Sequence, residues 1–563
     1  MVAVDKRIKD YLVISEIARS PNNVTLLARN ILTEEPVVLK SFHYDYNSDI
    51  NPEEQFSRFL RECEIHLFLK HPGIVPALDS FEYENTPYLV LEYKPYPTLR
   101  KLIDELRPFS ILQCIHIAQQ LCRAVQYLHD QGIIHRDVKP ENLLLSEKNE
   151  VFLTDFGCAR QVFAPNITQT KMIQGTLNYM SPEQLLGRED IDFRTDIFSI
   201  GVILYQLLTY QLPFKGLHPT DIVQNLLYNE PTSLRESNSY VPSELEELVY
   251  MTLQKDPDFR VPTSKKLEHE LQMILCQPGV YYCQAQWLIK NLNKIDLAKE
   301  YCLIALKRDK HHLPSWQLLG RIYQQQENWP KARQCFEFII EQQPGVPEVY
   351  FNLGQVAYAE QDIEIALKMF ERAWILEPTN QHYELHVAYA LQTNKMEESA
   401  LERYQHLIQS FPNWYLPFYE IGRLCYQMGE RENAMEYFRK ANKLEPNHYD
   451  ILYNLAALLH EMGHYKEALS IYEHILEIKP DCSKVKHNLA LLYYLMGEFE
   501  QARHHIESIS ENLTRETYLL KGFILSRLKQ LDDAIECFKK AIMCEPENLE
   551  AYLHLAATYR EKM

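Results

Sequence analysis

Residues 133–160, IIHRDVKPENLLLSEKNEVFLTDFGCAR, decide the fold of the N-terminal half. They place a carboxylate, a lysine and an amide within six residues, at Asp137, Lys139 and Asn142. Two short apolar runs, 143–145 and 151–153, predict a hairpin that leads to a second carboxylate, Asp155, on an Asp-Phe-Gly turn. Phosphoryl transfer from a nucleotide needs such groups, to orient a hydroxyl, to offset phosphate charge and to hold divalent metal.

Size and composition exclude several classes of protein. The 563 residues are 46% hydrophobic, which supports packed cores rather than disorder. The formal charge of −19 argues against nucleic acid as the main partner. The 12 cysteines form no close pair, and neither a secretion signal nor a transmembrane segment is present in the sequence, so we expect a reduced, cytoplasmic protein.

Together these motifs resemble the protein kinases over residues 9–275, and more specifically the serine/threonine (Hanks-type) kinases. The resemblance rests on H-R-D-x-K-x-x-N, on D-F-G, on Ser181-Pro-Glu183 and on Arg260 far along the chain. It implies an α+β domain of two lobes, an N-lobe at about 9–91 and a C-lobe at about 94–275.

The resemblance also implies roles for single residues. Asp137 would be the catalytic base, assisted by Lys139, whereas His135 would only pack. Asn142 and Asp155 would hold Mg²⁺, with Mn²⁺ as an alternative, and the cofactor would be ATP. The nucleotide would contact a set of residues from the strands, one helix and the hinge: Lys40 paired with Glu62, and Ile17, Thr25, Val38, Leu91, Glu92 and Tyr93.

A second group of residues would shape the activation segment and the C-lobe. Thr168 and Thr170 are candidate phosphorylation sites in that segment. Four further positions are implied to be structural: Thr176 beside the catalytic loop, Glu183 paired with Arg260, and Asp196 under the catalytic loop.

The nucleotide-binding strands depart from the kinase pattern. The three glycines of the phosphate loop fall on Ala18, Ser20 and Asn23, and glycine is the residue that lets a backbone approach phosphate closely. Thr25 and Val38 would crowd the adenine. Two hypotheses follow: an active serine/threonine kinase, which we favour because every charged group for the chemistry is present, or a pseudokinase scaffold.

The second half repeats itself every 34 residues. Alanine recurs at 298, 332, 366, 400, 434, 468 and 502. From Ala332 on, a small residue lies 12 positions before and a bulky, usually aromatic residue four positions after. This pattern resembles the tetratricopeptide repeat (TPR) and implies an all-α superhelical solenoid. We expect a linker at 276–283 and an array at 284–563 of about eight repeats ending in a lone capping helix, Asn548–Arg560. Its concave groove would bind a protein substrate or regulator; a rigid spacer or a dimerisation surface is the alternative.

Overall fold

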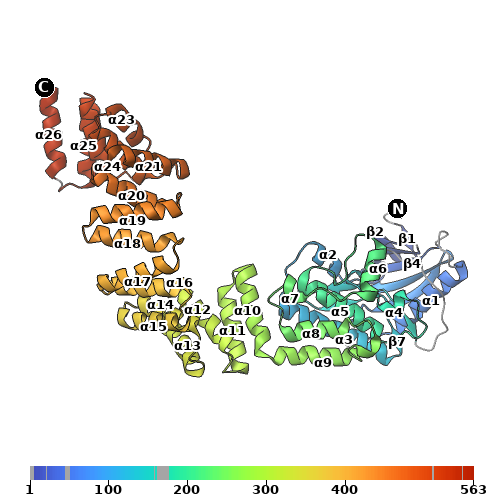
Figure 1. The fold of residues 1–563 in the computed structure, drawn as a ribbon. Coiled ribbons are helices and arrows are strands. Elements are labelled where there is room, and N and C mark those ends of the chain that lie inside the picture. Colours follow the sequence, from blue (N-terminus) through green and yellow to red (C-terminus); the bar gives the residue numbers. More distant parts are fainter. Residues whose placement is uncertain are drawn as a thin grey trace. The chain divides into compact units, whose positions relative to one another are not determined.

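The computed structural model describes residues 6–20, 22–44, 51–157, 159–161, 177–509, 513–547 and 549–563. The chain divides into two compact units, Met1–Gln326 and Glu327–Met563 (Figure 1). Each unit has its own hydrophobic core.

The first unit begins with an antiparallel sheet of six strands in the order β1-β2-β3-β4-β6-β5. Apolar residues alternate along β3 and bury one of its faces, whereas β6 is buried along nearly its whole length and the edge strand β5 has no buried residue. Helix α1, Pro52–Phe68, follows the fourth strand and begins at Asn51, whose side chain accepts hydrogen bonds from the Glu53 and Glu54 amides. The strands are β1 Arg7–Ile8, β2 Tyr11–Arg19, β3 Asn23–Asn30, β4 Pro36–Phe42, β5 Ala77–Tyr83 and β6 Thr86–Glu92.

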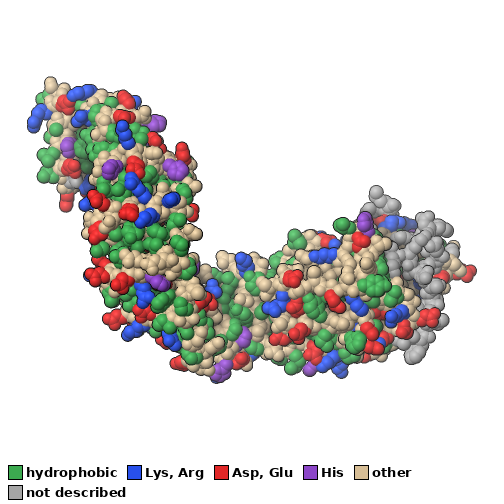
Figure 2. Space-filling model, in the orientation of Figure 1, with side chains coloured by type: hydrophobic (Ala, Val, Ile, Leu, Met, Phe, Trp, Pro, Cys, Tyr) green, Lys and Arg blue, Asp and Glu red, His purple; other side chains and the backbone are tan. Residues whose placement is uncertain are grey.

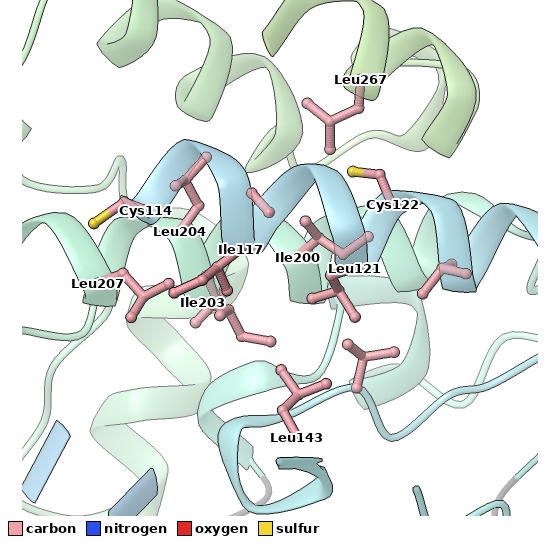
Figure 3. Close-up of a cluster of buried hydrophobic side chains, with 14 of the residues drawn as sticks. Cys114, Ile117, Leu121, Cys122, Leu143, Ile200, Ile203, Leu204, Leu207 and Leu267 are labelled. Atoms are coloured by element: carbon pink, nitrogen blue, oxygen red, sulfur yellow. The ribbon is translucent and has the colours of Figure 1, made fainter. Parts of the chain in front are cut away.

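A helical lobe follows, built around two long buried helices, α3 (Ile111–Asp130) and α5 (Arg194–Thr209). Helix α3 begins with a capping box between Ser110 and Gln113. Figure 3 shows Ile117 and Leu121 of α3 interleaved with Ile200, Ile203 and Leu204 of α5, and Leu143 lies below them. This core fixes the loop between α3 and α5, which carries the motif residues.

The remaining elements of this lobe are short. The predicted hairpin forms as β8 (Leu143–Leu145) paired with β9 (Val151–Leu153). The others are β7 Ile133–Ile134, β10 Arg160–Gln161, α2 Leu99–Asp104, α4 Pro182–Leu185, α6 Pro219–Tyr228, α7 Leu234–Ser237, α8 Ser243–Thr252, α9 Ser264–Cys276 and the 3₁₀ turns Pro140–Asn142, Leu177–Tyr179 and Pro257–Phe259.

Most of the segment that we expected to be a linker, 276–283, is helical instead. Helix α10 (Pro278–Leu292) begins there, because a proline in the first turn of a helix loses no intrahelical hydrogen bond. Val280 belongs to the core of the helical lobe, and the Leu112 amide donates to Gln284 Oε1 at 3.4 Å. Helices α11 (Ile295–Arg308) and α12 (Leu313–Gln325) complete this unit.

The second unit is wholly helical in its described residues. Each helix packs mainly against its neighbours in sequence, and the closest contacts lie within a helix pair, as a stack of repeats requires. Its helices are α13 Trp329–Gln342, α14 Pro347–Ala359, α15 Ile363–Leu376, α16 Gln381–Thr393, α17 Glu397–Ser410, α18 Tyr415–Gln427, α19 Arg431–Leu444, α20 Tyr449–Glu461, α21 Tyr465–Ile478, α22 Ser483–Leu495, α23 Phe499–Glu507, α24 Arg515–Arg527, α25 Leu531–Cys544 and the final α26 Leu549–Lys562.

The repeated glycines bring paired helices into direct contact. A methyl group on Gly354 would lie 2.6 Å from the Phe370 ring, and one on Gly422 would lie 2.7 Å from the Phe438 ring. The bulky residue therefore packs on the small residue 16 positions earlier, in the other helix of its own pair. The 34-residue period alone did not indicate this contact.

Acidic and basic side chains are mixed over the visible surface of the repeat unit rather than gathered in a patch of one sign (Figure 2). Within the part of the chain that the structure describes, no helix combines the length and the apolar character needed to cross a bilayer.

Candidate active site

The predicted nucleotide-contacting residues of the sheet share one face. Thr25 lies opposite Lys40 in the β3–β4 register, and Val38 lies opposite Leu91 in the β4–β6 register. Because residues two apart in a strand point to the same side, Val38 and Lys40 also share that face. Ile17 lies at a register irregularity between Glu16 and Ala18 of β2 and is half exposed.

The hinge after β6 offers a limited set of hydrogen-bonding groups. The Glu92 amide already donates to the Pro76 carbonyl at 2.9 Å, so Glu92 has only its backbone carbonyl for a base. The Glu92 side chain pairs with Lys94 at 2.6 Å. Tyr93 follows in the hinge and is partly buried.

A buried lysine joins the sheet, helix α1 and the Asp-Phe-Gly turn. Lys40 Nζ donates to Glu62 Oε1 at 2.5 Å and to Asp155 Oδ1 at 2.7 Å. Gly157 permits this arrangement, because a side-chain carbon there would lie 3.3 Å from Glu62 Oε2. The three elements are therefore in the arrangement in which a lysine can contact phosphate oxygens.

The protonation states of these groups follow from burial and charge. Burial disfavours the charged form of Lys40, but the two carboxylates outweigh it and raise the pKa of the ammonium. Burial raises the pKa of Glu62, against the opposing effect of Lys40. The Lys40 charge holds the pKa of Asp155 well below its ordinary range, so this carboxylate is ionised.

The catalytic loop holds Asp137 by one of its two oxygens. Asp137 Oδ2 pairs with Lys139 Nζ at 2.7 Å and accepts a hydrogen bond from Asn142 Nδ2 at 3.1 Å. Asn142 also donates to the Asp137 carbonyl at 2.8 Å. Asp137 Oδ1 is buried and has no hydrogen-bond partner within the described residues. An acceptor fixed in this way can take a hydrogen bond from a substrate hydroxyl.

The donors expected to hold a divalent metal are compatible with Mg²⁺. Asn142 uses its amide nitrogen on Asp137, which leaves its side-chain oxygen for a cation. Asp155 uses Oδ1 on Lys40 and on the Gly157 amide, and its side chain is 45% exposed. Magnesium is commonly held by one or two protein oxygens together with the substrate phosphates and water. The described residues contain no cluster of three or more His, Cys, Asp or Glu side chains that could hold a metal.

Asp196 at the start of α5 fixes the backbone of the loop from below. Its carboxylate accepts hydrogen bonds from the amides of His135 at 2.9 Å and Arg136 at 2.8 Å. His129 Nε2 lies 2.9 Å from the same carboxylate, a partner that the sequence interpretation did not identify. Arg136 has a φ of 64°, in the region that disfavours residues with a side chain, and these hydrogen bonds stabilise it there.

The distant pair predicted from the motifs forms as expected. Arg260 NH1 and NH2 donate to the two oxygens of Glu183 at 2.6 and 2.7 Å, although 77 residues separate them. Arg260 also donates to the carbonyls of Gln254 and Lys255. Bidentate geometry and these extra acceptors are what a buried ion pair needs.

Hydrogen bonds replace glycine flexibility at the turn between β2 and β3. The Ser20 amide donates to the Asn23 carbonyl at 2.8 Å, which closes a short turn. Asn22 Nδ2 donates to Gln55 Oε1 of helix α1 at 2.6 Å. The turn is thus attached to the helix that carries Glu62, a contact that no motif in the sequence indicates.

Two packing residues of the site were also missed. The His66 ring of α1 contacts Phe156, with ring centroids 4.6 Å apart, and the His135 ring also lies near Phe156, at 5.1 Å between centroids. Leu144 packs with Val38 and Leu91 under the sheet. A signal existed for His66, because it lies four residues after Glu62 on the same helix face. Thr168, Thr170 and Thr176 lie outside the described residues.

Comparisons with known proteins agree with this architecture. A model of the protein kinase domain matches residues 20–272, and models of the tetratricopeptide repeat match 318–381, 426–486, 459–519 and 516–548. Residues 20–272 are therefore a protein kinase domain, and tetratricopeptide repeats follow it.

The kinase domain is related to bacterial serine/threonine kinases. The chain is 34% identical over 250 residues to the serine/threonine-protein kinase PknB of Mycobacterium leprae, which is 44% of this chain and 40% of that protein. It is 35% identical over 251 residues to PknB of Mycolicibacterium smegmatis, with the same coverage. It is 32% identical over 246 residues to PrkC of Bacillus subtilis, 44% of this chain and 37% of that protein. The chain thus spans about two fifths of the length of these relatives.

Proposed function

We propose that this chain is an active serine/threonine protein kinase that transfers the γ-phosphate of Mg-ATP to a protein hydroxyl. One observation carries the proposal: among the described residues Asp137 Oδ1 is buried without a partner, while Lys139 and Asn142 fix the other oxygen. The Lys40–Glu62 pair at 2.5 Å supports it, because Glu62 holds the Lys40 ammonium where it can contact phosphate oxygens of the nucleotide.

The residues have distinct roles in the proposed reaction. The substrate hydroxyl attacks the γ-phosphorus, the bond to the β-phosphate oxygen breaks, and ADP leaves. Asp137 orients the hydroxyl and receives its proton at Oδ1, while Lys139 offsets the charge on the transferred phosphoryl group. Asn142 and Asp155 would hold Mg²⁺, or Mn²⁺ in its place, and the metal would neutralise phosphate charge. Thr176 would lie beside Asp137, and Thr168 and Thr170 would be self-phosphorylated.

The test is transfer of label from radioactive ATP to the full chain in the presence of Mg²⁺. Asp137→Asn preserves shape and removes the acceptor charge, so it should lower the rate by about 100- to 10,000-fold, the usual contribution of a general base. Asp130→Asn is the matched control, because Asp130 is exposed at the end of α3. Equal labelling of Asp137→Asn and wild type would contradict the proposal.

A pseudokinase scaffold is the second candidate, favoured by the lack of glycine at Ala18, Ser20 and Asn23. In that case neither the wild type nor the variant is labelled, and Mg-ATP does not raise the melting temperature. Binding without labelling would indicate a nucleotide-regulated scaffold.

We also propose that the tetratricopeptide repeats recruit a protein substrate or regulator. Stacked repeats expose extended surfaces that bind chain segments. Tethering of a substrate raises its effective concentration at the kinase domain, in favourable cases to the millimolar range. This role would offset weak binding of the protein substrate by the kinase domain.

A further inference from the structure

The repeat unit contains a cavity of about 570 Å³ built by three consecutive helix pairs. The first helices of these pairs, α14, α16 and α18, supply nearly all of its wall. It is lined by Gln355, Tyr358, Ala359, Phe370, His386, Tyr389, Gln392, Thr393, Glu420, Arg423 and Gln427. The size suits one or two side chains of a bound polypeptide segment.

A buried carboxylate lies in the wall of this cavity. Glu420 is 3% exposed, and it accepts hydrogen bonds from Tyr389 OH at 3.1 Å and from Arg423 NH1 at 2.9 Å. A carboxylate has about four acceptor positions, so two contacts leave capacity for further donors. Burial raises the pKa of Glu420 more than Arg423 and the Tyr389 hydrogen bond lower it.

The other walls are suited to a cation on an extended chain. Phe370, His386 and Tyr389 contribute rings, and the negative face of an aromatic ring attracts ammonium and guanidinium groups. Burial lowers the pKa of His386, so this ring stays neutral near pH 7. The carboxamides of Gln355, Gln392 and Gln427 can donate to and accept from a peptide backbone.

The net charge of the repeat unit also favours a basic ligand. Residues 327–563 contain 24 Lys and Arg against 36 Asp and Glu, a formal charge of −12. A field of this sign favours the approach of basic segments and disfavours acidic ones. Arg423 is the one Lys or Arg residue of the lining, and its guanidinium lies 2.9 Å from one oxygen of Glu420.

We propose that this cavity binds a lysine or arginine side chain of an extended basic segment in a partner protein, with Glu420 as the anchor. The proposal deepens the recruitment role proposed above and rests on it. It does not rest on kinase activity, because binding is measured without nucleotide.

The experiment selects ligands for the full chain from a displayed library of random linear dodecapeptides. Selected peptides should be enriched in Lys or Arg at one position. A synthetic copy should bind Glu420→Gln about 10- to 100-fold more weakly, the range for loss of a charge-assisted hydrogen bond. Glu402→Gln is the matched control, because it removes the same charge from an exposed residue of α17 outside the cavity. Arg423→Gln should bind the peptide more tightly, since it removes the competing cation.

Three results would overturn the proposal. Selection of acidic peptides whose binding is lost in Arg423→Gln would assign the cavity to a carboxylate. Equal affinity of wild type and Glu420→Gln, with both melting at the same temperature, would place basic peptides elsewhere. Failure to select any peptide would refute recruitment by the repeats, while leaving the labelling experiment on the kinase domain unaffected.

Discussion

The kinase domain and the repeat unit are stabilised by different kinds of contact. The kinase domain depends on single pairs of residues far apart in sequence, such as Glu183 with Arg260 and Lys40 with Asp155, 115 residues apart. The repeat unit uses the same local contact many times, with Gly354 against Phe370 and Gly422 against Phe438. One lost pair should therefore affect a whole catalytic domain, whereas a lost repeat contact has neighbours of the same kind.

The largest effect on stability should come from the buried ion pair. Glu183→Gln leaves the Arg260 charge buried without its partner, which should destabilise the first unit by about 3–5 kcal/mol. The matched change in the repeats is Glu467→Gln, where Glu467 pairs with Arg439 at 2.8 Å and both are about half exposed. That change should cost less than about 1 kcal/mol.

Peptide-resolved hydrogen exchange of the full chain checks both variants, because it reports each unit separately. Glu183→Gln should accelerate exchange in α3 and α5 and leave α16–α21 unchanged. Faster exchange in both units would mean that the loss of the Glu183–Arg260 pair is not confined to the kinase domain.

The second prediction concerns the pH dependence of stability and depends on His66, which is buried in the kinase domain. Burial lowers the pKa of His66 from 6.5 to about 4, while its Nε2 lies 2.7 Å from the Val75 carbonyl. Below pH 6.5 the unfolded chain takes up a proton that the native ring refuses, so stability falls as the pH drops from 6.5 towards 4. The full effect is about 3 kcal/mol at 1.36 kcal/mol per pKa unit.

Calorimetry of the full chain at pH 7 and pH 5 tests this, with the kinase transition identified as the one that Glu183→Gln shifts. His66→Gln cannot titrate, so its kinase transition should lose less stability between these pH values than that of the wild type. Identical losses in both proteins would mean that His66 is protonated in the native state.

The same contrast explains what could be predicted from the sequence. The two-lobed domain and the helical array followed from spaced motifs and a 34-residue period. Lys40 pairs with Glu62, Arg260 pairs with Glu183, and Asp196 accepts a hydrogen bond from the loop backbone. These contacts could be predicted because each implied role requires a particular side-chain chemistry. The attachment of Asn22 to Gln55 and the packing of His66 could not be predicted, since many polar or bulky residues could occupy those positions.

In the repeats, the 34-residue period could be read from the sequence, but the contact between the small residue and the bulky residue of each pair could not. Positions 16 apart pair Gly with Phe at 354/370, 422/438 and 522/538, and Ala with Tyr or Ile at 388/404, 456/472 and 490/506. The structure explains this: Phe packs on a bare Cα, whereas the Tyr404 and Tyr472 hydroxyls bond to Gln392 and Asn488. Only the first turns of helix α10, before residue 284, were assigned to a linker, because proline and glycine suggested one.

The third prediction tests this pairing. Gly422→Ala places a methyl group 2.7 Å from the Phe438 ring, and overpacking costs about 1–3 kcal/mol, of which alanine's better helix propensity returns about 1. A net loss of up to about 2 kcal/mol should appear as faster hydrogen exchange in α18 and α19 alone. Adding Phe438→Leu should recover part of the loss, because it removes the ring atoms that the methyl group meets. Gly422→Ala without any loss would mean that repeats adjust freely.

The smallest effect should come from the turns between paired helices. Left-handed residues recur there at Gln361, Lys395, Gly429, Gly463, Gly497 and Lys529, with φ between 60° and 83°. A side chain in this region costs about 1–2 kcal/mol, whereas glycine adds about 1 kcal/mol of unfolded-state entropy. Lys395→Gly should therefore stabilise the array by up to about 1 kcal/mol, and Gly463→Ala should destabilise it by a similar amount. Hydrogen exchange of the flanking helices measures both, and a stabilising Gly463→Ala would show that the turn relaxes to a right-handed form. Lys395→Gly and Gly463→Ala are reverse exchanges at equivalent sites. Opposite signs are therefore expected if the same left-handed backbone geometry is imposed on every repeat, whatever residue occupies the turn.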